Sequence, residues 1–426
     1  MIPTRVSLQP HNNYTFKKQT TKMNFKKPHT TFIISLLIVL FAAISCTPKQ
    51  EKTFEPRDPM PLDEIEYSFI HMDEYLPSKL VEKAEHPFLF PRLENISLPE
   101  DFVHNGNTYN TVHFLDSSDT QGLLVIQNDT IHYENYWKGQ KEDIQHISWS
   151  MAKSYISALF GIAMEEGHIK SIDQTVDEYL PELKGSGYEG VKIKDVLQMS
   201  SGIGFDETYS DPQSDIQQYW QGFVFGESQD EFTSTLANER PAGTFNKYVS
   251  MDTHVLGMII VKATGKSLTD YLQQKLWKPL GSEFDAYWIV DAKGMEMALG
   301  GINATLRDYA KIGRLYLNKG NWNGKQIIPA TWFETSTSST EEHLQPESEN
   351  SSDRGIGYGY QWWILDGNEG EYMAMGVFNQ YIYINPTTNT VIVKNSAYKN
   401  YYEKDNPYAS TMTHIELFRK LAHMND

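Results

Sequence analysis

The pattern of hydrophobic and polar positions predicts strands towards both ends of the chain and helices between them. Apolar runs bounded by turn residues are typical of β-hairpins. One hairpin is expected over 122–126 and 131–137, around Asn128 and Asp129, and a second over 380–384 and 390–394, around residues 385–389. Strands that flank a helix-rich stretch predict an α/β (α+β) sheet domain, interrupted by an α-rich lobe at about 176–290.

Five segments carry helical patterning: 148–166, 191–199, 251–263, 306–317 and 412–422. In the first, Ser148 is a candidate N-cap and Gly167 suits the left-handed position that follows a helix. Asp308 falls in the first turn of the fourth, where an acidic residue favours the helix dipole. Residues 62–100 are irregular and predict helix and loop. The polar, acidic stretch 336–354 predicts a mobile surface loop.

The N-terminus has the pattern of a targeting signal. Residues 1–45 hold six basic residues and no acidic one, and the apolar stretch 32–44 is shorter than the ~20 residues that span a bilayer. Small residues then lead to Cys46. This stretch resembles the lipobox of a bacterial lipoprotein, which implies cleavage before Cys46 and lipidation of its thiol. An uncleaved signal anchor is the alternative, and the true start is Met1 or Met23.

The predicted organisation follows from that signal. Residues 1–46 form the signal sequence with its lipobox, 47–100 a tether and N-terminal extension, and 101–424 the globular domain. The lipobox resemblance implies a protein of the bacterial cell envelope. A lipid anchor would hold it at the membrane, on the periplasmic face or the cell surface.

Composition and charge exclude several classes of protein. Of the 426 residues, 40% are hydrophobic, which is enough for a large core and argues against a disordered chain. The net charge of −18 with no basic block argues against binding of nucleic acid. One cysteine allows no internal disulfide, cysteine zinc site or iron–sulfur cluster, and the histidines form no H-E-x-x-H motif. No metal or organic cofactor is implied.

The segment around Ser150 carries the most specific chemistry. Ser150 and Lys153 form an S-x-x-K motif at the predicted start of a helix. Residues three apart share a helical face, so the amine can approach the hydroxyl, and a lysine with a lowered pKa can act as its base. A surface helix cap is the alternative. A second copy, Ser396 to Lys399, follows a strand and precedes a loop, so we interpret it as a chance match.

Two later segments could complete a site. Tyr248 and Ser250 precede a helix, and a tyrosine beside a lysine can relay a proton. The alternative, favoured from these residues alone, is a packed tyrosine with Ser250 as N-cap. Gly376, on a predicted strand, could present a backbone N–H to a reacting carbonyl, or belong to a simple core strand. No G-x-S-x-G elbow is present, which argues against an α/β-hydrolase.

These three segments, in this order and spacing, resemble the class C branch of the serine β-lactamase and penicillin-binding superfamily. So do the runs Gly300–Asp308 and Ala310–Leu317. The resemblance implies a class C β-lactamase-like fold, with an antiparallel sheet flanked by helices plus an α-rich lobe. It also implies Ser150 as nucleophile, Lys153 and Tyr248 as its proton-transfer partners, Ser250 in support of Lys153, and an oxyanion site at Gly376 and Val377.

Within that branch, Ser-Met-Ala-Lys-Ser and Tyr-x-Ser are most similar to the 6-aminohexanoate-dimer hydrolases and related esterases. β-Lactamases and many peptidases of the superfamily place Lys-Thr-Gly or His-x-Gly on the strand that holds Gly376. This chain has Ala374-Met-Gly376-Val377, with no cation. Because that cation grips a substrate carboxylate, its loss weakens the case for an efficient β-lactamase.

The sequence therefore predicts a secreted, lipid-anchored serine hydrolase that cleaves amide or ester bonds in a small or peptide-like substrate. The alternatives are a β-lactamase or D,D-peptidase, and a penicillin-binding-like protein that acylates without turnover or serves as an interaction module. The loop Phe205 to Tyr209 either lines the pocket or is an ordinary solvated loop, and the second is favoured. The physiological substrate and the oligomeric state stay open.

Overall fold

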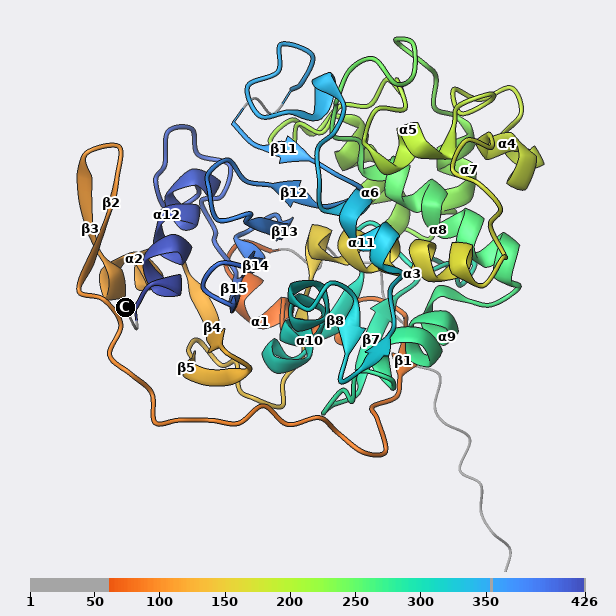
Figure 1. Cartoon of the computed structure of the whole chain (residues 1–426). Helices are drawn as coiled ribbons and strands as arrows, with labels where there is room; N and C mark the ends of the chain where they lie inside the picture. Colours follow the sequence, from red (N-terminus) through yellow and green to blue (C-terminus); the bar gives the residue numbers. More distant parts are fainter. Residues whose placement is uncertain (1–60, 353–354, 425–426) are drawn as a thin grey trace, which may run out of the picture. The chain divides into compact units, whose positions relative to one another are not determined.

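A seven-stranded antiparallel sheet forms the centre of the described chain (Figure 1). Its strands, in spatial order, are β11 (Gly357–Tyr358), β12 (Trp363–Ile364), β13 (Tyr372–Gly376), β14 (Gln380–Asn385), β15 (Thr390–Ser396), β4 (Thr120–Gln127) and β5 (Thr130–Tyr136). Both predicted hairpins are confirmed as β4–β5 and β14–β15. They lie side by side because β15 pairs with β4.

The computed structural model describes residues 61–352 and 355–424. The predicted signal sequence with Cys46, and residues 47–60 of the predicted tether and N-terminal extension, lie outside these residues. Among the described residues no helix is both long and apolar enough to cross a bilayer.

Both faces of the sheet are covered, which explains its continuous apolar strands. Leu124 and Ile126 of β4 join the larger core cluster, whereas Leu123 and Val125 join a second cluster on the opposite face. Helix α10 (Leu306–Leu317) contributes to the first cluster and α12 (Thr411–Ala422) to the second, and Figure 1 shows them on either side of the strands. Both helices match their predicted positions.

The packing of α10 on the sheet requires a glycine. A Cβ atom at Gly313 would lie 2.6 Å from Cγ1 of Val391 on β15, closer than real contacts allow. Thr305 caps the helix by accepting a hydrogen bond from the N–H of Asp308. The Asp308 carboxylate in turn accepts from Lys311, so the buried acid and the buried amine are paired.

A second, four-stranded sheet was not predicted. Its order is β1 (Ser78–Val81), β7 (Ala286–Ile289), β8 (Ile302–Ala304) and β6 (His146–Ile147). The prediction of helix and loop over 62–100 was wrong at β1, although α1 (Ile65–Ser68) and the 3₁₀ turn η1 (Met72–Glu74) agree with it. β1 is stabilised by its pairing with β7, some 200 residues later. No local pattern reports such a contact.

The helix-rich region lies to one side of the main sheet (Figure 1). Its helices are α4 (Val176–Tyr179), α5 (Ile193–Leu197), α6 (Asp215–Val224), α7 (Gln229–Ser234), α8 (Ser250–Thr264) and α9 (Leu268–Leu272). The predicted helix over 251–263 is confirmed as α8, whereas the one over 191–199 is shortened to α5. The predicted domain boundaries themselves stay a prediction.

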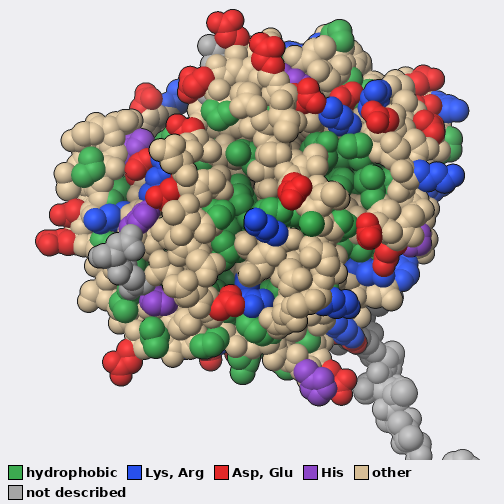
Figure 2. Space-filling model, in the orientation of Figure 1, with side chains coloured by type: hydrophobic (Ala, Val, Ile, Leu, Met, Phe, Trp, Pro, Cys, Tyr) green, Lys and Arg blue, Asp and Glu red, His purple; other side chains and the backbone are tan. Residues whose placement is uncertain are grey.

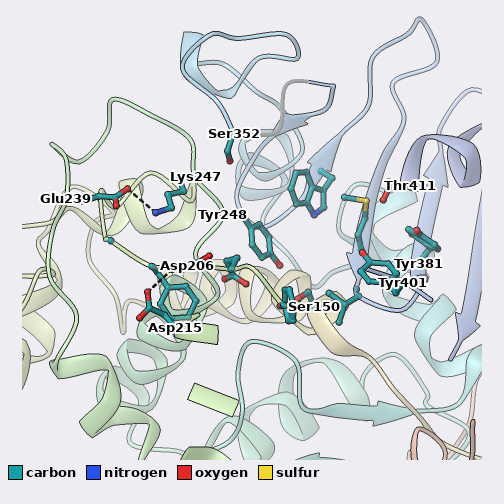
Figure 3. A pocket seen from close by; sticks show the side chains of 18 residues that line it. Ser150, Asp206, Asp215, Glu239, Lys247, Tyr248, Ser352, Tyr381, Tyr401 and Thr411 are labelled. Carbon is teal, nitrogen blue, oxygen red and sulfur yellow. Dashed lines mark hydrogen bonds and ion pairs between the residues drawn. The ribbon is translucent and has the colours of Figure 1, made fainter. Parts of the chain in front are cut away.

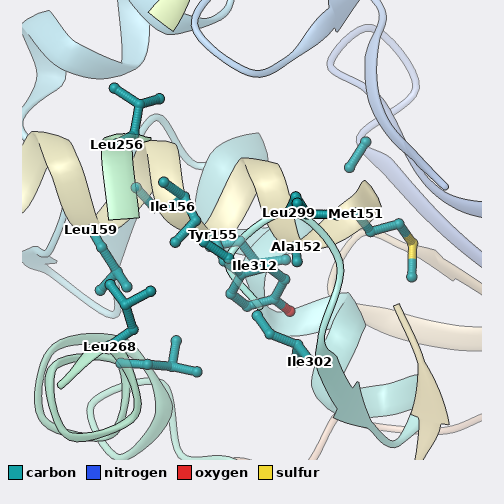
Figure 4. Packing of buried hydrophobic residues seen from close by; sticks show 14 of the residues in the cluster. Met151, Ala152, Tyr155, Ile156, Leu159, Leu256, Leu268, Leu299, Ile302 and Ile312 are labelled. Atoms are coloured by element: carbon teal, nitrogen blue, oxygen red, sulfur yellow. The ribbon is translucent and has the colours of Figure 1, made fainter. Parts of the chain in front are cut away.

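Helix α3 (Ala152–Glu165) is buried along most of its length, from Ala152 to Ala163. A helix that is apolar all round is typical of a protein core. Figure 4 shows its residues Tyr155, Ile156 and Leu159 among side chains of α8, α9 and α10. The helix therefore gives rigid support to the residues at its N-terminus.

The part of 336–354 that the structure describes is largely loop at the surface, as predicted, and its mobility stays a prediction. The segment follows α11 (Ala330–Ser336) and includes the 3₁₀ turn η5 (Glu342–Leu344). Leu344 is 2% exposed and packs with Met199 and Tyr358. Because the segment is mostly polar in composition, its one buried leucine could not be predicted from the pattern.

The remaining elements complete the described chain. They are β2 (Asp101–His104), β3 (Asn107–Asn110), α2 (Thr111–Ser117), η2 (Trp149–Met151), η3 (Pro181–Leu183), η4 (Gln273–Trp277), β9 (Asn321–Trp322) and β10 (Lys325–Gln326). In the view of Figure 2, charged side chains of both signs lie around the rim, and hydrophobic side chains gather in a recess near the middle.

Candidate active site

Ser150 lies in the short turn η2, immediately before α3. The backbone of Trp149 has φ 44°, a left-handed conformation that is costly for a non-glycine residue and is common at functional sites. Ser148 holds the turn: its N–H donates to the carbonyl of Ile302, and its hydroxyl donates to that of Gly300. Ser148 thus occupies the N-cap position of η2, but its hydroxyl makes no capping hydrogen bond, while Gly167 has the expected left-handed φ of 76°.

Lys153 approaches Ser150 as its spacing predicted. Its Nζ lies 3.1 Å from the Ser150 hydroxyl, 3.4 Å from the Ser250 hydroxyl and 2.8 Å from the Leu299 carbonyl oxygen. A neutral amine has two hydrogens and one lone pair. If the hydrogens go to Leu299 and Ser250, the lone pair is left to accept the Ser150 proton.

Burial lowers the pKa of the Lys153 amine to about 7, against the smaller opposing effects of the Glu207 and Asp252 carboxylates. Desolvation disfavours the charged ammonium, because an amine in an apolar interior loses its hydration. Lys153 can thus exist as a neutral base near neutral pH. Near that pH an ordinary lysine is fully protonated.

Two carboxyl groups near Lys153, the half-buried Glu207 and the buried Asp252, were missed by the sequence reasoning. Glu207 accepts a short hydrogen bond from the backbone N–H of Ser250, and Asp252 accepts from the Tyr188 hydroxyl at 2.9 Å. Burial raises the pKa of both carboxyls, that of Asp252 to about 8. Neither residue belongs to a motif, so their role becomes visible only from their proximity to Lys153 in the folded chain.

The loop Phe205 to Tyr209 that carries Glu207 lines the cavity at Ser150. The favoured interpretation of this loop as an ordinary solvated one was therefore wrong. Its mixture of aromatic and acidic residues was the only signal in the sequence.

Tyr248 and Ser250 are brought to the same place. The Tyr248 ring centroid lies 5.1 Å from Lys153 Nζ, and the ring stacks on Trp363 of β12 at 5.5 Å. Figure 3 shows the Tyr248 oxygen directed towards Ser150. Ser250 is the first residue of α8 and Val249 its N-cap, so the alternative that made Ser250 the cap was wrong.

Gly376 ends β13 directly against the Ser150 turn. A Cβ atom here would lie 2.6 Å from the Ser148 carbonyl oxygen and 3.1 Å from the Ser150 nitrogen, so a side chain would force the strand away. β13 pairs with β12 only through Tyr372 and Met373, which leaves its far end beside Ser150. Val377, the next residue, lines the same cavity as Ser150.

The cavity over Ser150 has a volume of about 640 Å³. Figure 3 shows it between the helix-rich region, which supplies Asp206, Asp215, Glu239 and Lys247, and the sheet side, which supplies Tyr381 and Tyr401. Among the described residues that line it, Lys247 is the single lysine or arginine, and it is paired with Glu239 at 2.9 Å. The helix-rich wall is thus acidic and the opposite wall apolar and aromatic.

A serine hydroxyl next to a buried amine of lowered pKa, beneath an open cavity, is the arrangement of a serine hydrolase. Residues 113–410 match the beta-lactamase family, and the chain belongs to that family. It is a beta-lactamase-family hydrolase, and the predicted resemblance, fold class and enzyme class are confirmed.

The relatives agree with this assignment. The chain is 32% identical over 292 residues to the 6-aminohexanoate-dimer hydrolase of Paenarthrobacter ureafaciens. The matched region covers 67% of this chain and 74% of that protein. A Bacillus anthracis structure classed as a 6-aminohexanoate-dimer hydrolase has a TM-score of 0.75 at 25% identity, over 88% of this chain and 97% of that one. EstCE1, a hydrolase with promiscuous acyltransferase activity, shares the fold. Its TM-score is 0.58 at 14% identity, over 73% of this chain and 96% of that one.

The structure brings Ser150, Lys153, Tyr248, Ser250, Gly376 and Val377 to one cavity or its immediate border. Their individual catalytic roles stay predictions. Among the described residues, no group of three or more His, Cys, Asp or Glu side chains is arranged to hold a metal ion.

Proposed function

We propose that this protein is an amidase or esterase that works through an acyl-enzyme on Ser150. The observation that carries the proposal is the 3.1 Å contact between the Ser150 hydroxyl and Lys153, whose amine has a pKa of about 7. A serine hydroxyl needs such a base, because it is a weak nucleophile at neutral pH.

The proposed reaction begins when neutral Lys153 accepts the Ser150 proton as Ser150 Oγ attacks the substrate carbonyl. Ser250 and the Leu299 carbonyl keep the amine oriented through its two hydrogens. The backbone N–H groups of Ser150 and Val377 stabilise the oxyanion, a contribution worth ~10²–10³ in turnover per donor. Tyr248, or Lys153 itself, protonates the leaving group, and water then hydrolyses the acyl-enzyme.

The charges of the cavity favour this activity over the action of a β-lactamase or D,D-peptidase. The substrates of those enzymes carry a carboxylate, and a binding site for it needs a cation. Here the cavity wall offers Asp206, Glu207, Asp215 and Glu239 against one paired lysine, Lys247. The similarity to a 6-aminohexanoate-dimer hydrolase, whose name indicates an amide substrate, supports cleavage of an amide bond.

The proposal includes export and lipid anchoring at Cys46, on the periplasmic face or the surface of the cell. Its support is the basic, apolar and small-residue pattern that ends at this single cysteine. Metabolic labelling with an alkyne fatty acid in a bacterial host tests it. Label on the wild type and none on Cys46→Ser is expected, whereas equal labelling of both would contradict the anchor.

Reaction of the full-length protein, solubilised in detergent, with a fluorophosphonate tests the nucleophile. One adduct is expected, mapped by peptide mass to Ser150 and not to Ser396 of the second S-x-x-K. Ser150→Ala should take up no probe and should lose hydrolysis of an activated ester, with an unchanged unfolding temperature. An adduct elsewhere, or full turnover by the variant, would move the nucleophile. No adduct on the wild type would favour a binding protein.

A further inference from the structure

A second, smaller cavity opens beside Ser150. Its volume is about 40 Å³, and its walls include Trp149, Ile216, Trp220, Leu299 and Phe378. We call it the inner cavity. The polar groups in its lining are the side chains of Ser150 and Gln217, three tyrosine hydroxyls and the tryptophan indole N–H groups. The other lining side chains are apolar. It is suited to an apolar group attached close to the reacting carbonyl.

The inner cavity ends at an aromatic wall. Trp220 packs edge-on against Trp149 at 5.7 Å, and Phe378 packs edge-on against Tyr402 at 5.5 Å. Behind the same residues lies an outer cavity of about 430 Å³, which Trp220, Phe378 and Tyr402 also line. Leu62 and Phe225, 60% and 67% exposed, stand at its surface. The wall therefore limits how far a chain can extend from Ser150.

The position of Tyr248 indicates which part of the substrate enters each cavity. The leaving group has to lie near its proton donor, and Tyr248 lines the large cavity but not the inner one. The leaving group then belongs in the large cavity, with its acidic wall. The acyl chain, on the other side of the reacting carbonyl, points into the inner cavity.

We infer that the inner cavity is an acyl-binding subsite for a short, unbranched aliphatic chain, and that substrates are amides or esters of such acids with a polar leaving group. This inference rests on the proposed acyl-enzyme at Ser150. A volume of about 40 Å³ holds about three water-sized groups, and a methylene is close to a water molecule in size. The subsite therefore fits the three carbons that a butanoyl group carries beyond its carbonyl.

A series of p-nitrophenyl esters, from acetyl to decanoyl, tests the subsite in the full-length protein. Each methylene accommodated in an apolar site raises kcat/KM about fourfold. We expect a rise of roughly 15-fold from acetyl to butanoyl, which differ by two methylenes, and a fall from hexanoyl onwards. A flat profile, or one that rises steadily to decanoyl, would overturn the inference.

Two variants move the profile in opposite directions. Trp220→Ala removes the wall and joins the two cavities, so the preferred chain should lengthen to hexanoyl or octanoyl. Ile216→Phe fills the inner cavity, so the preference for butanoyl over acetyl should disappear while acetyl ester is still hydrolysed. Trp137→Ala, a partly buried tryptophan that lines none of these cavities, is the matched control and should keep the wild-type profile.

The results separate the two levels of the proposal. Turnover of the acetyl ester that requires Ser150, with no dependence on chain length in any variant, would overturn the acyl subsite and leave the proposed function standing. Loss of turnover for every ester, with no fluorophosphonate adduct on Ser150, would overturn both.

Discussion

At the scale of single residues, the state of Lys153 decides whether Ser150 can react. Three oxygen atoms surround the amine, and two carboxyls, Glu207 and Asp252, lie close enough to favour its charged form. The ring of Tyr248 also faces it. Asp252 has its pKa raised to about 8, so it is largely neutral at pH 7, and Glu207 has the larger effect of the two on the pKa of Lys153.

Glu207→Gln should therefore shift the pH dependence of acylation. A negative charge raises the pKa of a neighbouring lysine, so its removal lowers the pKa of Lys153 further. Because the neutral amine is the active form, the acid limb of kcat/KM should move to lower pH, by about one unit. The measurement is the rate of fluorophosphonate labelling between pH 4 and 9.

Asp206→Asn is the control, because Asp206 lines the same cavity but is exposed and does not act on Lys153. The acid limb of its pH profile should not move. If Glu207→Gln instead reacts more slowly with the fluorophosphonate at every pH, and its acid limb does not move, then Glu207 only holds the backbone of Ser250. A shift to higher pH would show that the sign of the electrostatic argument is wrong.

At the scale of elements, the segment after α11 acts on the site through one buried side chain. Leu344 packs with Met199 and Tyr358, and Tyr248 and Trp363 lie against the same cluster. The stack of Tyr248 on Trp363 thus has an apolar support that comes from a polar segment.

Leu344→Ala should lower activity by loosening Tyr248. Truncation of a buried leucine costs about 2–5 kcal/mol of local stability, and the loss falls on the side chains that Leu344 supports. We expect kcat for an amide substrate to fall by roughly tenfold, since a displaced proton donor is costly to the reaction. Steady-state kinetics and thermal unfolding measure the two effects separately.

Leu89→Ala is the matched control, because Leu89 is 66% exposed and should change neither kcat nor the unfolding temperature. A Leu344→Ala protein with wild-type kcat would mean that the segment after α11 does not hold Tyr248 in position.

The elements also show what sequence patterns can and cannot predict. The two hairpins, α8, α10 and α12 follow from local apolar periodicity, and the contact of Ser150 with Lys153 follows from helical spacing. Strand β1, Glu207 and Leu344 were missed, because each acquires its role from a partner far away in sequence. Periodicity reports the environment of neighbours along the chain, not contacts made by folding.

At the scale of the whole molecule, charge and cavity act in the same direction. The chain carries −18 overall, and four of its acidic residues line the large cavity: Asp206, Glu207, Asp215 and Glu239. A cleft lined by one sign of charge concentrates ligands of the opposite sign. The enzyme should therefore select against anionic substrates before any chemistry takes place.

A pair of acetate esters of equal size tests this selection, one with a quaternary ammonium on the alcohol and one with a carboxylate. We expect kcat/KM to favour the cationic ester by roughly tenfold or more at low salt, since steering by charge changes association by 10-fold to 10³-fold. The ratio should fall several-fold in 1 M salt, because the screening length shrinks from about 30 Å at 0.01 M to about 3 Å. A neutral ester should respond little to salt.

Two variants then locate the charges responsible. Asp206→Asn should reduce the preference for the cationic ester, because Asp206 lines the cavity, whereas Glu85→Gln removes an exposed charge that lines none of the described cavities and should leave it intact. Equal effects of the two would assign the selection to net charge alone. If the anionic ester is preferred instead, Lys247 is released from Glu239 when substrate binds, and a carboxylate-bearing substrate such as a β-lactam becomes the better candidate.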